Sequence, residues 1–191
     1  MPLQYVNRKG RTFYLHQGLT KTGKPKYFFS MKGEGTLVDN IPDGFEIYEN
    51  PNAQVFLRKI QPKIISDEEV ALVEQGMRQF SKVKYYQIDV KKNTIIIYEA
   101  NQDVDMLAEL LSSAPQVKTV DKKDLLGQLL SYSPMLQFVL VDEEKRKFVT
   151  QRYCFLGSID DWIQIGKPDK LQNLVKKYVK HLGQESYYSL Y

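Results

Sequence analysis

The pattern of hydrophobic and polar positions predicts short strands that come in pairs. In residues 12–16 and 27–31, apolar and polar positions alternate, as they do in strands with one buried face. Residues 94–98 are apolar or β-branched on both faces, which predicts an interior strand. Turn-forming or charged residues separate the members of each pair, so the pattern predicts four β-hairpins. Their strands are expected at 12–16 with 27–31, 45–48 with 54–60, 84–90 with 94–98, and 135–141 with 148–155.

Other segments carry apolar residues at helical spacing. The first starts at a capping box, in which Ser66 and Glu69 each accept a hydrogen bond from the other residue's backbone. Residues 103–111 predict a second helix, and residues 121–130 predict a third that is capped by Asp121. The core-facing positions of these two helices are Val104, Leu107, Leu110, Leu111, Leu125, Leu126 and Leu129.

The last helix has the clearest apolar stripe. Pro168 suits its first turn, and Gly183 can close it in the left-handed conformation. A basic outer face is expected at Lys170, Lys176, Lys177 and Lys180. The stripe consists of Leu171, Leu174, Val175, Tyr178 and Leu182.

The order of these elements predicts the fold class. Because helices and strands do not alternate one for one, we expect antiparallel β-hairpins that form a sheet with amphipathic helices packed on it. The expected fold is therefore α+β. Residues 1–62 would form a basic, β-rich unit of two hairpins, and residues 63–191 an α+β main domain. One compact domain is the alternative, because residues 1–60 hold few apolar positions for a core of their own.

Composition is that of an ordinary globular protein, with 42% hydrophobic and 26% charged residues in 191. The single Cys154 excludes an internal disulfide and is expected to be a small buried hydrophobe. One cysteine and two histidines leave little for a zinc site, so we predict no metal and no cofactor. There is no apolar run of about 18 residues and no signal peptide, so a cytoplasmic protein without membrane contact is expected.

Positive charge is concentrated at the start of the chain. Residues 1–32 hold seven Lys or Arg and no Asp or Glu, whereas residues 33–191 hold 20 basic and 23 acidic residues. This asymmetry favours an anionic partner.

The first hairpin is therefore predicted to bind nucleic acid, with cations that hold phosphates and aromatic rings that stack on bases. If its apolar face packs on a core, Lys24, Lys26, Lys32 and His16 are left beside Tyr14 and Phe28 on the outer face. In the alternative interpretation, the lysines only keep an edge hairpin from pairing with other chains. The candidate residues are Arg8, Lys9, Arg11, Tyr14, Lys21, Lys24, Lys26, Phe28 and Lys32.

Two other functions are weighed against this one. Three tyrosines in residues 187–191 predict docking on the protein's own core or on another chain, as in a protein-interaction module or a homodimer. The chain also matches the PD…(D/E)xK motif of metal-dependent nucleases at Asp43, Asp89 and Lys91. In that motif, carboxylates hold Mg²⁺. That pattern is short and Pro-Asp-Gly is a common turn, so binding without catalysis is the preferred prediction.

Two further local signals have structural interpretations. His181 is expected to cap the last turn of the final helix, where a partly cationic imidazole suits the helix dipole. Residues 158–161 fit the N-cap of a short helical turn before Trp162, which would then be a core anchor.

Overall fold

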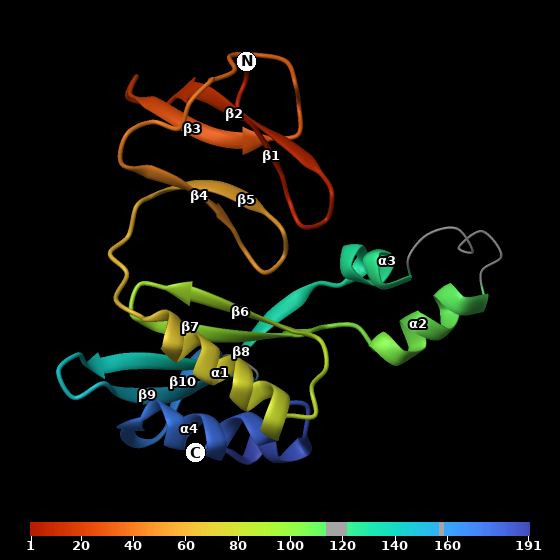
Figure 1. The fold of residues 1–191 in the computed structure, drawn as a ribbon, viewed down its shortest axis with the longest axis vertical. Helices are drawn as coiled ribbons and strands as arrows, with labels where there is room; N and C mark the ends of the chain where they lie inside the picture. Colours follow the sequence, from red (N-terminus) through yellow and green to blue (C-terminus); the bar gives the residue numbers. More distant parts are fainter. Residues whose placement is uncertain (114–121, 157–158) are drawn as a thin grey trace. The chain divides into compact units, whose positions relative to one another are not determined.

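The computed structural model describes residues 1–113, 122–156 and 159–191 and has an α+β fold with antiparallel sheets, as predicted (Figure 1). The chain divides into two compact units. The first contains Met1–Gln61 and Asp105–Leu130, and the second contains Pro62–Val104 and Ser131–Tyr191. Each is described by itself below.

The first unit begins with a three-stranded antiparallel sheet in the order β1-β2-β3. Its strands are β1 (Gln4–Val6), β2 (Thr12–Leu19) and β3 (Pro25–Ser30). The first predicted hairpin is confirmed as β2–β3, in which His16 pairs with Phe28. Strand β1 was not predicted, because three residues are too few to show alternation.

The second predicted hairpin is confirmed as β4 (Phe45–Glu49) and β5 (Val55–Lys59). It packs on the first sheet, where the rings of Tyr27 and Phe45 lie 6.5 Å apart. Leu15, Ala53 and Val55 are buried in this unit.

A buried asparagine joins the β1–β2 turn to the β4–β5 turn. The Asn7 side chain donates to the carbonyl of Ala53 at 2.7 Å and accepts from the backbone N–H groups of Lys9 at 3.1 Å and Arg11 at 2.9 Å. Ala53 itself has a φ of 61°, a left-handed conformation that suits glycine better than alanine.

We therefore expect Ala53→Gly to raise the free energy of unfolding by about 1 kcal/mol, because it relieves left-handed strain. Ala71 is a matched control, since it lies exposed within a regular helix. There the same substitution should lower stability by about 1 kcal/mol. Chemical denaturation of the two variants measures both effects, and losses of equal size would contradict the account of Ala53.

The second unit is built on a five-stranded antiparallel sheet in the order β10-β9-β8-β7-β6. The third predicted hairpin is confirmed as β6–β7 and the fourth as β8–β9, and β7 is an interior strand as expected. The bounds are β6 (Tyr86–Lys91), β7 (Thr94–Ala100), β8 (Tyr132–Asp142), β9 (Lys147–Leu156) and β10 (Ile159–Lys170).

Strand β10 corrects the prediction of a helical turn near residues 158–161. Ser158 lies outside the described residues, but Ile159 onward pairs with β9, with Trp162 opposite Tyr153. Trp162 is half-buried and packs edge-on against the Tyr153 ring at 5.1 Å, so it is not a core anchor. Pro168 is also in β10 rather than in the last helix, at an irregularity of an edge strand, where a missing N–H is tolerated. Pairing along the length of β9 overrides the local capping signal.

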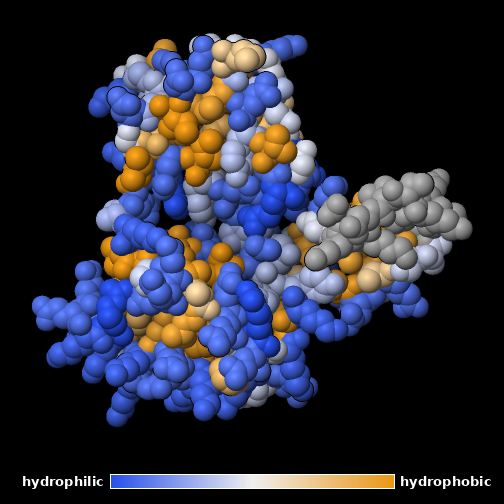
Figure 2. Space-filling view, viewed as in Figure 1, coloured by the Kyte–Doolittle hydropathy of each residue, from blue (hydrophilic) through white to orange (hydrophobic). Residues whose placement is uncertain are grey.

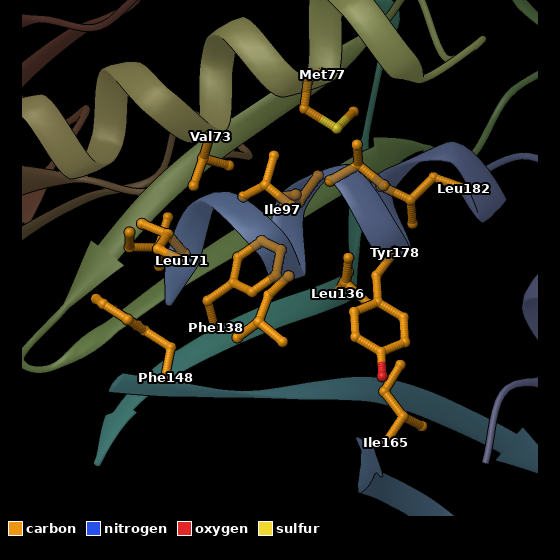
Figure 3. Close-up of a cluster of buried hydrophobic side chains, with 14 of the residues drawn as sticks. Val73, Met77, Ile97, Leu136, Phe138, Phe148, Ile165, Leu171, Tyr178 and Leu182 are labelled. Carbon is orange, nitrogen blue, oxygen red and sulfur yellow. The ribbon is translucent and has the colours of Figure 1, made fainter. Parts of the chain in front are cut away.

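Helices α1 (Asp67–Phe80) and α4 (Leu171–Tyr178) pack on one face of this sheet (Figures 1 and 3). The capping box of α1 is confirmed, with Glu69 N–H donating to Ser66 Oγ at 3.3 Å and Ser66 N–H to Glu69 Oε2 at 3.0 Å. The five predicted stripe residues of the last helix are all buried, and Gly183 has the expected positive φ of 67°. The core between helices and sheet includes Val73, Met77, Ile97, Leu136, Phe138, Phe148 and Ile165.

A close approach between the two helices requires a glycine. A Cβ atom built at Gly76 would overlap Cγ1 of Val175, so α1 can lie this near to α4 only without a side chain there. Beyond α4 the chain continues in two 3₁₀ segments, η2 (Val179–His181) and η3 (Glu185–Ser189).

Helices α2 (Val104–Ser113) and α3 (Lys122–Leu129) are found where helices were predicted, although Asp121 lies outside the described residues. The expectation that their leucines face a core is partly wrong. No residue of α2 is buried, and Leu110 is 56% exposed. In α3, Leu126 is buried, but Leu129 is 50% exposed. Helical spacing identifies an apolar face without identifying what covers it.

Candidate nucleic-acid interface

The outer face of the first hairpin carries cations beside an aromatic ring. Alternation along β3 brings Lys26 and Phe28 to the same face of the sheet, and Lys24 lies in the turn just before this strand. Phe28 stacks on the imidazole of His16 with ring centres 5.4 Å apart and keeps 41% of its surface exposed.

A segment after β3 crosses this face and covers part of it. It ends beside the opposite edge of β2, where Leu37 pairs with His16. On the way, His16 Nε2 donates to the Lys32 carbonyl at 2.9 Å, and a Cβ at Gly33 would lie 3.5 Å from the Tyr14 ring. His16 is therefore buried at 6% exposure, which corrects the prediction that it stays on the open outer face.

Tyr14 and Phe28 thus differ as stacking platforms. The Tyr14 ring is half-buried beside the crossing segment, whereas Phe28 reaches solvent. We name Lys24, Lys26, Phe28 and Lys32 together the cationic face. Lys21 lies at the hairpin tip next to it.

Two of the candidate cations are used inside the first unit. Arg8 forms an ion pair with Glu49 at 2.7 Å and also donates to the Asn50 carbonyl. Burial raises the pKa of the Glu49 carboxyl, but hydrogen bonds from Arg8 and Tyr5 outweigh it and hold that pKa below its ordinary value. Lys9 donates to the carbonyl of Leu130 at 2.7 Å, and burial lowers its pKa.

The other five candidate cations are exposed, and within the described part of the chain their side chains form no ion pair with a carboxylate. They are Arg11, Lys21, Lys24, Lys26 and Lys32.

Arg11 lies apart from the cationic face. With Lys9 it lines a groove of about 310 Å³ next to the β4–β5 hairpin of the same unit. Met31 and Phe56 also line this groove, and neither was a predicted site residue. Alternation assigned Met31 to the buried side, and no sequence signal brings β5 near it.

The tyrosine-rich end docks on its own unit, one of the two outcomes that were predicted. Tyr187 is 1% exposed, and its hydroxyl lies 2.5 Å from the Met135 carbonyl and 3.0 Å from that of Tyr153. Burial raises the pKa of Tyr187. Tyr188 and Tyr191 are 57% and 87% exposed.

The residues of the nuclease pattern fall in different units. Asp43 is exposed in a loop before β4, in the first unit. Asp89 and Lys91 share a face of β6 in the second unit, as predicted, with 3.6 Å between Lys91 Nζ and Asp89 Oδ2. Across residues 1–113, 122–156 and 159–191, no group of three or more His, Cys, Asp or Glu side chains could hold a metal ion.

Cys154 is buried, as predicted, at 1% exposure. His181 differs from its prediction as a cationic helix cap. It lies in η2, and its Nδ1 is 2.9 Å from Ser186 Oγ. Burial lowers its pKa, with a further contribution from the charge of Lys180, so the neutral imidazole is favoured.

Within the described residues, no helix is both long and apolar enough to cross a membrane. Comparisons with models of known protein families, with curated proteins and with solved structures gave no match.

Proposed function

We propose that this protein binds nucleic acid through the cationic face of its first hairpin and does so without catalysis. The observation that carries the proposal is the set of exposed cations around the exposed ring of Phe28, whose side chains form no ion pair with a carboxylate of the described residues. Phosphates supply the missing anions, and the ring offers a surface on which a base can stack. On this proposal the protein is cytoplasmic and meets its ligand there.

The exposed state of these lysines suits a contact with phosphates. Exposed ammonium groups on flexible stems follow a phosphate backbone without reading its sequence. Each neutralised phosphate also releases condensed counterions, which adds affinity at low salt. The proposal therefore describes a sequence-independent interface that is sensitive to salt.

Substitution of Lys24, Lys26 and Lys32 together by glutamine should lower affinity for labelled nucleic acid at low salt by about tenfold or more, since three phosphate contacts are lost. Fluorescence anisotropy with DNA and RNA measures this. The matched control replaces Lys170, Lys176 and Lys180, which are exposed on or next to α4 in the other unit. Both variants lose the same charge, so equal losses of affinity would show that only net charge matters and would contradict a local site.

The second candidate function is self-association, and the exposed tyrosines of the C-terminal segment favour it. On this account, sedimentation shows a dimer that forms as concentration rises and that Tyr188→Ser combined with Tyr191→Ser removes. A monomer at every concentration excludes it.

A further inference from the structure

The groove beside Arg11 has the composition of a binding site for a flat, anionic ligand. Its apolar surface includes Phe13 and Val55 and two strongly exposed side chains, Met31 at 59% and Phe56 at 45%. Among the described residues, its charged lining residues are Lys9 and Arg11, and none is Asp or Glu. Apolar patches also lie among hydrophilic residues on the surface of this unit's strands (Figure 2).

The framework of the groove is held in place before any ligand arrives. The Asn7 side chain ties the β1–β2 turn to the carbonyl of Ala53, and its oxygen already accepts from two backbone N–H groups. The β4–β5 turn is fixed in turn by Asn50, whose side-chain oxygen accepts from the N–H groups of Asn52 and Gln54. The volume of the groove is at the lower end of the range for small-ligand sites. Because Lys9 donates to the carbonyl of Leu130, Arg11 is the lining cation that can contact an anionic group of a ligand.

A row of stacked groups leads to the groove along β4 and β5. The Arg58 guanidinium lies 4.1 Å from the centre of the Tyr48 ring. Tyr48 in turn stacks on Phe56, with ring centres 6.3 Å apart and 28° between the planes. Because Phe56 lines the groove, a flat ring placed there would extend the row by one member.

Met31 lines the groove, and the next residue in sequence is Lys32 of the cationic face. Because neighbouring side chains in an extended segment point to opposite faces, the groove and the cationic face are separate surfaces of the first unit.

We propose that the groove takes one unpaired base of a single-stranded nucleic acid, packed against Phe56 and Met31, with the adjoining phosphate at Arg11. This inference rests on the proposed function and deepens it, because it names single strands as the preferred ligand. A base inside a duplex is stacked on both faces and cannot enter the groove, whereas phosphates of either form can reach the lysines.

The test measures the affinity of the whole protein for a 12-nucleotide pyrimidine strand and for the duplex of the same length. The wild type should bind the single strand more tightly. Phe56→Leu should lower single-strand affinity about tenfold, the effect of one lost base–aromatic stack, and leave duplex affinity unchanged. Met31→Ala should act in the same direction without removing a ring that packs on Tyr48, so the two variants together separate binding from folding. Leu19→Ala, at an exposed position on the hairpin outside the groove, is the control and should change neither affinity.

Two outcomes would overturn the inference and are distinguishable from each other. Equal affinity for the single strand and the duplex, unchanged in Phe56→Leu and Met31→Ala, would show that the groove does not bind a base. The proposed function would then still stand. Failure to bind either form at low salt would remove the proposed function as well.

Discussion

Replacement of Tyr187 by alanine is expected to destabilise the second unit by about 3–5 kcal/mol, the usual cost of removing a fully buried aromatic side chain. Its ring is 1% exposed, and Arg152, which is equally buried, lies 5.9 Å from the ring centre. Its hydroxyl also contacts the carbonyl groups of Met135 and Tyr153, which lie in β8 and β9. The substitution would therefore release the C-terminal segment and uncover buried polar groups.

Trp162 gives a direct measurement of this effect. It is the protein's single tryptophan and lies in β10 of the second unit, so its fluorescence in urea reports the unfolding of that unit. Tyr188→Ala is the matched control, because that neighbouring side chain is 57% exposed and should contribute less than about 0.5 kcal/mol. Equal midpoints for the two variants would contradict the docking of Tyr187.

The second large effect concerns Glu99 and pH. Its Oε1 atom is buried without a hydrogen-bond partner among the described residues. Burial raises the pKa of this carboxyl to about 7, although a hydrogen bond from the Gly183 backbone lowers it in part. In the unfolded chain a glutamate has a pKa of about 4.3, so between these two values the folded protein holds a proton that the unfolded chain has lost.

Stability of the second unit should consequently fall as pH rises from about 4.3 to about 7, and then become level. The total change is on the order of 4 kcal/mol, from about 1.4 kcal/mol for each pH unit over that interval. Glu99→Gln should remove this slope and make the unit more stable than the wild type at pH 8. Urea unfolding of both proteins at several pH values, followed by Trp162 fluorescence, measures the difference. Parallel pH profiles would contradict the assignment.

Local sequence patterns predicted most of the elements. Turn chemistry and apolar periodicity gave the hairpins, the capped helix at Ser66 and the stripe of the last helix. They missed β10, because its polar edge residues and Asp160–Asp161 resemble a helix start, while its conformation is set by pairing with β9. They also placed His16 in solvent, because alternation says which face a side chain takes and not which loop later crosses that face.

In the candidate site, too, part of the arrangement follows from local sequence and part from contacts between residues distant in the chain. The excess of positive charge in residues 1–32 is a property of the sequence and was predicted. Which cations stay exposed depends on residues far away in the chain. Glu49 forms an ion pair with Arg8, and the carbonyl of Leu130 accepts a hydrogen bond from Lys9. The groove depends on the bond between Asn7 and Ala53, and no periodicity relates two turns 46 residues apart.

The affinity for nucleic acid as a function of salt tests the central claim most directly. Anisotropy of a labelled strand should show log K falling linearly with log salt between about 50 and 200 mM, with a slope of about −0.7 to −0.9 for each phosphate contacted. The variant without the lysines at 24, 26 and 32 should give a slope smaller by about two to three. No binding at the lowest salt, or the same slope in the variant and the wild type, would contradict a nucleic-acid site on the cationic face.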